Sequence, residues 1–291
     1  MLELRVRNKL AAAEMEGRAG KLPAPGDWDV LLSGPCRVDR PDGRPLAIYL
    51  PGVLAGQMDA PGVYDILHSI QLVSVNRGLA SGTPRIKSGQ TRSYTRKIYS
   101  GLLGAVDPGG QTRYCRLTAW TGSHLPQWQA LRPLLVNISA LLAAHVPDRY
   151  QAQAREISKT NPAWVVPDTV FTTITVNNSY ATGVHTDKGD LDAGFSCLAV
   201  LRRGDYTGGV LVQPQYRVGV DMGHGDLLLM DAHEWHGNTQ LACAHGPLNG
   251  PCKTCGAERI SLVAYFRTKL TGCGTPEEEH GKAEAWRRRT R

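Results

Sequence analysis

The sequence predicts an α+β protein with a double-stranded β-helix core, of the jelly-roll or cupin-like type, flanked by N-terminal helices. Short segments rich in β-branched and aliphatic residues follow one another between residues 170 and 267, separated by Gly and Asp. A stretch with helical spacing precedes them, and the 32 glycines and 18 prolines suit a loop-rich globular chain. With 291 residues, of which 42% are hydrophobic, the chain can bury a sizeable core.

The helical stretch extends from Gln127 to Val146. Its apolar residues recur at helical spacing: Leu131, Leu134, Leu135, Ile138, Leu141 and Leu142. Pro147 marks its end. We expect the apolar stripe to pack on a sheet and assign the helix no catalytic role.

The strands of the core are expected within six segments: 170–178, 195–203, 208–215, 216–221, 226–231 and 259–267. Several short strands within about a hundred residues are typical of a closed or double-sheet β architecture.

Composition narrows the class of protein. The 33 Lys and Arg exceed the 26 Asp and Glu, which gives a net charge of +7 and a mild bias toward polyanions. Met1–Gly20 has no apolar leader region, and no apolar run is long enough to span a membrane. Seven cysteines are an odd number, which favours reduced thiols over a disulfide scaffold. We therefore expect a cytoplasmic monomer without a membrane partner.

Two histidines and an aspartate form a candidate iron site. His185 and Asp187 are two residues apart, so on a strand they share a face. His236 follows the apolar segment 226–231. Two His and one carboxylate form the facial triad of non-haem Fe(II) oxygenases, which leaves positions for a co-substrate and O2. His233 competes with His236 for this role, and the spacing alone does not choose between them.

Arg259 begins the last predicted strand and is the candidate anchor for 2-oxoglutarate. An oxygenase of this type needs a buried cation for the far carboxylate, which Arg binds through two parallel hydrogen bonds. Ser261 is two residues on, so it shares that face and can add a hydroxyl donor. The alternative is an exposed charge at a strand end.

A cysteine-rich insertion separates His236 from Arg259. Cys243, His245, Cys252 and Cys255 could form one tetrahedral zinc site, because C-x2-C is a common half-site. Cys273 is the rival fourth ligand, but the intervening strand of about eight residues spans about 26 Å. Free cysteines in a loop are the alternative.

The segment between Asp65 and Asp107 contains no acidic residue. Its cations are Arg77, Arg85, Lys87, Arg92, Arg96 and Lys97, interleaved with Gly, Ser, Thr and Tyr. Spaced cations among small polar residues suit a loop along phosphates. A solvated loop is the alternative.

Several motifs resemble the TET/JBP family of Fe(II)- and 2-oxoglutarate-dependent DNA-base dioxygenases. They are HTDKGD (185–190), GGVLVQPQ (208–215), GDLLLMD (225–231), HEWHGN (233–238) and ERISLVAYF (258–266). PDGRPLAIYLPG (41–52) and VNRGLASG (75–82) are similar to its N-terminal region. The compact phage and fungal-type members are more similar than the large animal ones, so we expect a phage protein in a bacterial host, or a nuclear protein in a eukaryote.

The resemblance implies roles for particular residues. His185, Asp187 and His236 would bind iron, with the WHGN context selecting His236, and Arg259 would bind 2-oxoglutarate. Asp190 would read a flipped 5-methylpyrimidine base in DNA, and a turn residue after Gly189 is the alternative role. A carboxylate accepts from the N4 amino group of cytosine, which favours 5-methylcytosine over thymine as the base hydroxylated.

Asn177, Arg77, Arg85 and Lys87 complete the candidate substrate-binding residues. We divide the single catalytic domain, 1–291, into three parts: an N-terminal helical and DNA-contacting part (1–165), the double-stranded β-helix core (166–270) and a basic tail (271–291). We expect Trp286 to Arg291 to be solvated.

Three rival functions remain. An oxygenase acting on a protein or small molecule would keep the triad without needing the basic loop. A silent DNA-binding module would need only the loop, and a zinc-stabilised structural protein would depend only on the cysteines.

Overall fold

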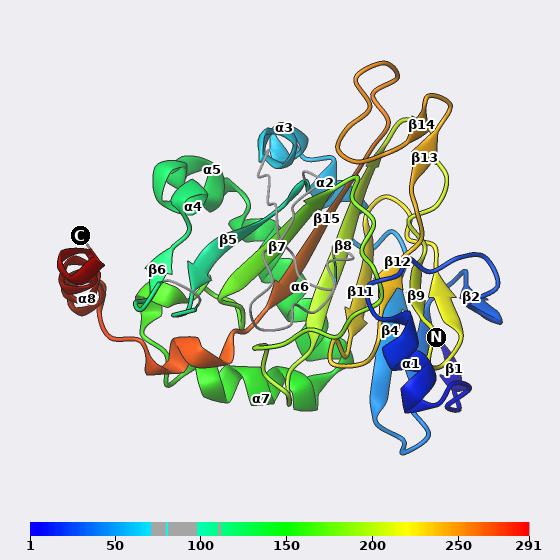
Figure 1. Ribbon diagram of the computed structural model, residues 1–291, viewed down its shortest axis with the longest axis horizontal. Coiled ribbons are helices and arrows are strands. Elements are labelled where there is room, and N and C mark those ends of the chain that lie inside the picture. The colour runs from blue at the N-terminus through cyan, green and yellow to red at the C-terminus, as the bar shows by residue number, and fades with distance from the viewer. Residues whose placement is uncertain (71–79, 81–97, 110–111, 291) are drawn as a thin grey trace. The chain divides into compact units, whose positions relative to one another are not determined.

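The computed structural model describes residues 1–70, 80, 98–109 and 112–290 (Figure 1). Arg77, Arg85 and Lys87 lie outside these residues, so the DNA-contacting loop stays a prediction. The chain forms two compact units. Unit 1 comprises Met1–Gly101, Val176–Asp187 and Leu198–Leu262, and unit 2 comprises Leu102–Thr175, Lys188–Cys197 and Val263–Arg291.

Unit 1 contains most of the strands. Its elements are β1 (Leu2–Arg5), α1 (Ala12–Arg18), β2 (Val30–Leu32), β3 (Cys36–Asp39), β4 (Pro45–Leu50), α2 (Ala55–Met58), α3 (Val63–Ser69), β9 (Leu211–Gln213), β10 (Val218–Val220), β11 (Asp226–Met230), β12 (Gly237–Asn238), β13 (Ala242–Cys243) and β14 (Gly246–Pro247). Most of β8 (Ser196–Arg203) and β15 (Glu258–Tyr265) also belongs to it.

Two sheets of unit 1 form the double-stranded β-helix that the sequence predicts. In the larger sheet neighbouring strands follow the order β1-β3-β4-β11-β8-β15, and in the smaller the order is β12-β9-β10-β2. β4 pairs with β3 and with β11 in antiparallel fashion, whereas β1 pairs with β3 in parallel. All six predicted strand segments contain a strand.

The first fifty residues contribute strands as well as helix α1. β1, β3 and β4 join the larger sheet and β2 joins the smaller one. The sequence predicts helices in this part. β1, β2 and β3 have three or four residues each, which is too short for the alternation of apolar and polar residues in a strand to be recognised. β4 and β11 are apolar on both faces, with Ile48, Leu227 and Leu229 fully buried. They form the centre of the unit 1 core.

Unit 2 contains most of the helices. Its elements are β6 (Arg116–Leu117), α4 (Ala119–Ser123), α5 (Leu125–Ala130), α6 (Arg132–His145), α7 (Pro147–Ile157), the 3-10 helices η2 (Pro162–Trp164) and η3 (Thr268–Gly272), α8 (Pro276–Thr290), and parts of β5 (Ser100–Val106) and β7 (Thr173–Asn178). Strand order in this unit is β7-β5-β6.

The helix expected over 127–146 is divided between α5 and α6. The break falls at Leu131, because Pro133 lies in the first turn of α6 and has no backbone N–H to continue the hydrogen bonds of α5. Pro147 ends α6 as expected, and it also occupies the first turn of α7. Ile138 and Leu142 are fully buried, which confirms the apolar stripe.

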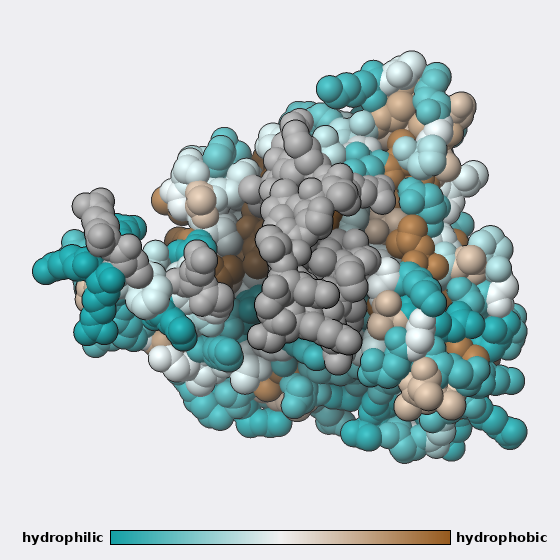
Figure 2. All heavy atoms as spheres, in the orientation of Figure 1, coloured by the Kyte–Doolittle hydropathy of each residue, from teal (hydrophilic) through white to brown (hydrophobic). Residues whose placement is uncertain are grey.

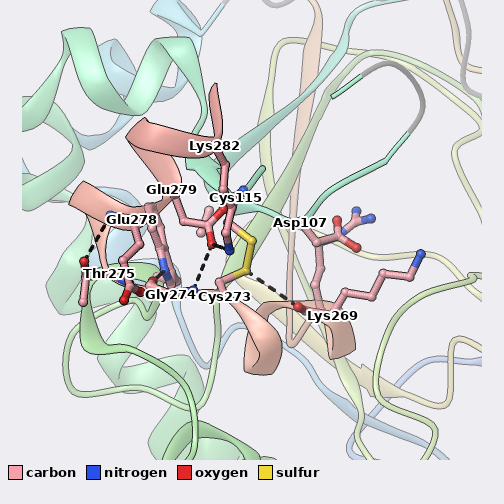
Figure 3. Close-up of a disulfide and its surroundings, with 12 residues drawn as sticks. Asp107, Cys115, Lys269, Cys273, Gly274, Thr275, Glu278, Glu279 and Lys282 are labelled. Carbon is pink, nitrogen blue, oxygen red and sulfur yellow. Dashed lines mark hydrogen bonds and ion pairs between the residues drawn. A yellow bond between two sulfur atoms is a disulfide. The ribbon is translucent and has the colours of Figure 1, made fainter. Parts of the chain in front are cut away.

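A disulfide joins Cys115 to Cys273 within unit 2 (Figure 3). This corrects two expectations, namely that the thiols are all reduced and that Cys273 is a rival zinc ligand. The two cysteines are 158 positions apart, so their spacing carries no signal of proximity. Glu279 of α8 lies beside the disulfide and accepts hydrogen bonds from the backbone N–H groups of Cys115 (2.7 Å) and Gly274 (2.9 Å).

The expected basic tail is mostly the helix α8. Arg287, Arg288 and Arg289 in its last turn are exposed, as a solvated tail requires, and Figure 2 shows its atoms as largely hydrophilic. Trp286 is half-buried and packs with Arg113, whose guanidinium carbon lies 5.9 Å from the ring centroid. Among the described residues, no helix has the length and apolarity needed to cross a membrane.

Candidate metal centre

Backbone pairing brings the first two candidate ligands together. His185 and His236 form an antiparallel bridge in which each N–H donates to the other's carbonyl at 2.9 Å. Directly opposite residues in such a pair point to the same face, so the two imidazole rings lie side by side with centroids 4.4 Å apart. The N–H of Asp187 donates to the carbonyl of Ala232 at 2.9 Å, so the two segments stay in contact beyond the bridge, although out of its register.

The three candidate ligands converge. Asp187 Oδ1 lies 3.4 Å from His185 Nε2, and Asp187 Oδ2 lies 4.0 Å from His236 Nε2. One ligand atom from each residue lies within 4.8 Å of the other two, a spacing that allows all three to bind one metal ion. His233 does not join this group, and its Nδ1 lies 3.4 Å from Asp231 instead. The structure therefore selects His236 over His233.

Both imidazoles are oriented by hydrogen bonds through Nδ1. His185 Nδ1 donates to the carbonyl of Gly183 at 2.7 Å, and His236 Nδ1 donates to that of Glu234 at 2.9 Å. These bonds place the free lone pair on Nε2, the atom that faces Asp187. Burial, and secondarily the neighbouring His185, lowers the pKa of His236 to about 4. His236 is therefore neutral near pH 7, as a metal ligand must be.

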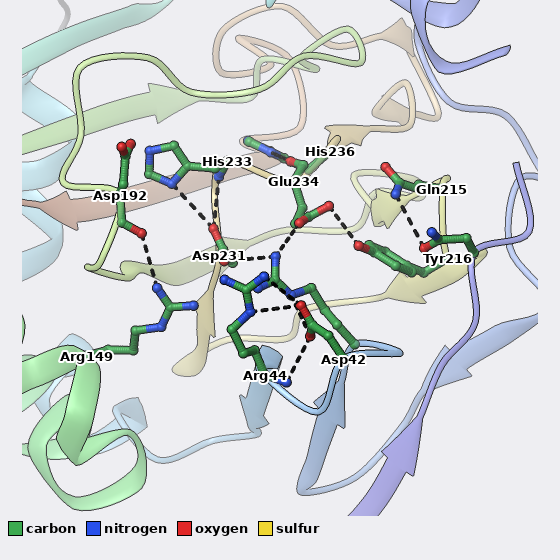
Figure 4. A network of polar contacts seen from close by, with 12 residues as sticks. Asp42, Arg44, Arg149, Asp192, Gln215, Tyr216, Asp231, His233, Glu234 and His236 are labelled. Atoms are coloured by element: carbon green, nitrogen blue, oxygen red, sulfur yellow. Dashed lines mark hydrogen bonds and ion pairs between the residues drawn. The ribbon is translucent and has the colours of Figure 1, made fainter. Parts of the chain in front are cut away.

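A polar network supports the loop that carries His236 (Figure 4). Glu234 accepts hydrogen bonds from Arg40 (2.5 Å) and Tyr216 (2.8 Å). Arg40 also lies 3.7 Å from Asp231 and is itself nearly buried. The network holds both ends of 231–234. No pattern in the sequence predicts this network, because Arg40 lies 194 positions from Glu234.

Arg259 is a buried cation, with 4% of its surface exposed. Its Nη2 atom has no hydrogen-bond partner among the described residues, and burial lowers the pKa of its guanidinium. Leaving a charged donor buried and unpaired is costly. The exposed strand-end alternative is therefore wrong, and the donor set suits the carboxylate of a bound acid.

Two residues near Arg259, Tyr206 and Gly209, are not predicted from the sequence as part of the site. Tyr206 is buried, and its hydroxyl has no hydrogen-bond partner in the described part of the chain. Burial raises the pKa of this hydroxyl, whereas the positive charge of Arg259 lowers it. Gly209 has φ of +76°, and a Cβ there would lie 2.9 Å from Leu241 and 3.2 Å from Arg259. The Gly-Gly pair that follows Tyr206 in the sequence is a sign of close packing.

Ser261 and Asn177 are brought together in unit 1. Asn177 Nδ2 donates to Ser261 Oγ at 3.5 Å, and Asn177 Oδ1 accepts from Ser100 Oγ at 2.6 Å. Ser261 is buried, two residues beyond Arg259. Their roles toward co-substrate and substrate stay predictions.

Asp190 belongs to unit 2. It accepts a hydrogen bond from Ser196 Oγ at 3.4 Å and forms a backbone bridge with Arg267. Its role in reading a base stays a prediction.

Three of the four candidate zinc ligands converge. The sulfurs of Cys243, Cys252 and Cys255 all lie within 4.8 Å of one another. The side chain of His245 is not part of this group, although its backbone N–H lies 3.4 Å from Cys243 Sγ. Hydrogen bonds from the backbone N–H groups of Cys255 and Thr254 lower the pKa of the Cys252 thiol.

Comparisons with known proteins agree with this geometry. The model of the Tet_JBP family, the oxygenase domain of the 2OGFeDO superfamily, matches residues 107–268. Thymine dioxygenase JBP1 of Trypanosoma brucei brucei is 35% identical over 179 residues, which cover 59% of this chain and 19% of that protein. The bifunctional helicase and thymine dioxygenase JBP2 of the same species (strain 927/4 GUTat10.1) is 33% identical over 186 residues, which cover 62% of this chain and 16% of that protein.

The chain thus spans about a fifth or less of the length of these relatives. Among solved structures, NgTET1 in complex with 5mC DNA covers 89% of this chain and 87% of its own, with a TM-score of 0.59 and 16% sequence identity. That likeness shows a shared fold. The family match covers more than half of the chain and includes His185, Asp187, His236 and Arg259. The protein therefore belongs to the Tet_JBP family of oxygenase domains in the 2-oxoglutarate- and Fe(II)-dependent dioxygenase superfamily.

Proposed function

We propose that this protein hydroxylates the 5-methyl group of a pyrimidine base in DNA, using Fe(II), 2-oxoglutarate and O2. Family membership supports an oxygenase that acts on DNA bases. The relatives are named thymine dioxygenases, and the structural neighbour was solved with 5mC DNA. A methyl group inside a duplex is out of reach of a metal centre within the protein, so the base would flip out of the helix. We also propose that the enzyme acts as a monomer.

His185, Asp187 and His236 would hold the iron. Two imidazoles and one carboxylate match the ligand set of a 2-His-1-carboxylate centre. When bound, Fe(II) would supply O2 activation and the oxidising power that removes a hydrogen atom from a methyl group. The Nδ1 hydrogen bonds to Gly183 and Glu234 would keep both Nε2 atoms aimed at the metal.

The observation that carries the proposal is the buried Arg259. Its Nη2 lacks a partner in the described residues, so the folded protein has a charged donor that an anion would satisfy. The far carboxylate of 2-oxoglutarate is such an anion, and Arg binds carboxylates bidentately. The unpartnered hydroxyl of Tyr206, which interacts electrostatically with Arg259, would donate a second hydrogen bond.

5-Methylcytosine is our first candidate base, because the carboxylate of Asp190 would accept from the exocyclic amino group of cytosine. Thymine is the second candidate, and the names of the JBP1 and JBP2 relatives favour it.

Nucleoside analysis would test the proposal. The protein would be incubated with Fe(II), 2-oxoglutarate and two DNA duplexes of one sequence, with 5-methylcytosine present in one duplex and only cytosine in the other. Mass spectrometry of the digested DNA should detect 5-hydroxymethylcytosine from the first duplex. 5-Hydroxymethyluracil from either duplex would identify thymine as the base.

The control is the His236→Ala variant, which should give no product from either DNA. Succinate formed by the wild type with neither hydroxylated nucleoside would reject DNA as the substrate while keeping the oxygenase.

A further inference from the structure

A β-hairpin and a tight turn position the cysteines of the insertion between β12 and β15. Cys243 lies in β13, whose register with β14 pairs Cys243 with Gly246 and leaves a two-residue turn. Ala242 exchanges backbone hydrogen bonds with Thr207 at 2.8 and 3.0 Å, which fixes this hairpin to the rest of unit 1.

Cys252 and Cys255 belong to a tight turn. The N–H of Gly256 donates to the carbonyl of Cys252, and the N–H of Cys252 donates to the carbonyl of Ala257, both at 2.9 Å. Gly256 has φ of +69°, which suits a residue that reverses the chain just after a ligand. Backbone N–H groups of Thr254 and Cys255 point at the Cys252 sulfur, as donors to a thiolate would.

The three cysteines form no disulfide, and each sulfur lies within 4.8 Å of the other two. Cys243 and Cys252 also pack on a small core of Ala181, Tyr206, Leu241, Leu248 and Ala257, which limits their movement. Three converging thiols with a C-x2-C half-site on a glycine-terminated turn form most of a tetrahedral site for a thiophilic cation.

We propose that Cys243, Cys252 and Cys255 bind a structural zinc ion as thiolates, with His245 as the fourth ligand after rotation of its exposed side chain. His245 occupies the two-residue turn of the hairpin, so its ring has room to move. This site is separate from the iron centre and does not depend on the proposed substrate.

Zinc bound at this site would affect the start of β15. Only three residues separate Cys255 from Arg259, and Ala257 between them is buried and bonded to Cys252. Zinc would therefore fix the chain where β15 begins, and would order 243–257 without touching the reacting groups.

Metal content measured on the full chain tests the proposal. The protein would be purified with added zinc under reducing conditions and then desalted. Elemental mass spectrometry should then find one zinc ion per chain. Cys252→Ser and Cys255→Ser should each lower zinc at least tenfold, whereas Cys36→Ala, at a buried free cysteine outside the cluster, should retain it. His185→Ala should lose iron and keep zinc.

Cobalt(II) substitution tests the ligand type. Thiolate ligands would give a near-ultraviolet charge-transfer band, absent in Cys252→Ser and present in His185→Ala. His245→Ala should bind zinc at least tenfold more weakly. Unchanged affinity in this variant would overturn the assignment of His245. Less than a tenth of an equivalent of zinc in the wild type, or as much zinc in Cys252→Ser as in the wild type, would overturn the zinc site. A Cys252–Cys255 disulfide in the metal-free chain would also count against it, because it would identify the two cysteines as a redox pair.

Discussion

The iron centre and the cysteine cluster use different means to bring ligands together. His185 and His236 are hydrogen-bonded to each other through their backbones, and His236 has only 7% of its surface exposed. The cysteines belong to a hairpin and a turn, and Cys255 is exposed. The first set is positioned by the fold and should persist without metal. The second is more exposed, so a bound metal would contribute more of its order.

The largest effect should come from His185→Ala. Loss of an iron ligand should reduce turnover by more than about a hundredfold, beyond what loss of a supporting hydrogen bond costs. The metal-free fold should change little, because the backbone pairing with His236 does not need the imidazole. Turnover assays and denaturant unfolding of the metal-free variant would check both halves. Retained turnover would contradict the ligand assignment, and collapse of the fold would contradict the comparison.

Arg259→Met should separate stability from co-substrate binding. Arg259 is buried and its Nη2 atom has no partner among the described residues, so an apolar side chain of similar size should leave stability unchanged or raise it. The melting temperature without 2-oxoglutarate should therefore hold or rise. The wild type should gain stability when 2-oxoglutarate is added, by mass action on the folded state, and the variant should gain none.

Thermal unfolding with and without 2-oxoglutarate, in the absence of O2, measures both effects. Arg259→Lys is the matched control, since it keeps the charge but loses the two-pronged geometry. An equal 2-oxoglutarate-induced shift in wild type and Arg259→Met would remove Arg259 from the co-substrate site.

The sequence predicted the residues that converge at the candidate iron site but not the residues that support them. H-x-D spacing and a strand beginning with Arg indicated His185, Asp187 and Arg259, whereas the choice of His236 over His233 came from the family resemblance. The six strands of the core were predicted from local periodicity. Arg40, the partner of Glu234, was missed because its contact joins positions 194 apart, a distance over which local patterns carry no information.

The helices and cysteines of unit 2 show the same limit. Apolar spacing located α6, but the break at Leu131 depends on Pro133 and on packing. The Cys115–Cys273 disulfide could not be read from spacing at all.

Acid should destabilise the metal-free iron centre. The pKa of His236 is lowered to about 4 in the folded state, against 6.5 when it is exposed. The unfolded chain then binds the proton first, so stability falls as the pH decreases from about 6.5 to about 4 and is constant below that. The loss should total up to about 3 kcal/mol. Denaturant unfolding across this range should show it, and His236→Gln should flatten the slope. An equal slope in that variant would assign the effect to other groups.

A smaller effect should come from Gly209→Ala. Its positive φ costs an L-residue about 1 kcal/mol, and the added Cβ would crowd Leu241 and Arg259. Gly52→Ala is the matched control, because Gly52 has φ of +65° with no atom within 4 Å of its Cβ position. Both variants should lose stability, but only Gly209→Ala should also raise the KM for 2-oxoglutarate. A KM change of the same size in Gly52→Ala would place the cause in backbone strain alone.

The central claim is that His185, Asp187 and His236 hold one ferrous ion while Arg259 anchors the co-substrate. Anaerobic titration of the metal-free protein with Fe(II) and then 2-oxoglutarate tests this directly, through the visible charge-transfer band of the iron–keto-acid complex. The account predicts a band that saturates at one iron per chain in the wild type, is absent in His236→Ala, and requires at least tenfold more 2-oxoglutarate in Arg259→Met. A band of equal strength in His236→Ala, or none in the wild type, would contradict it.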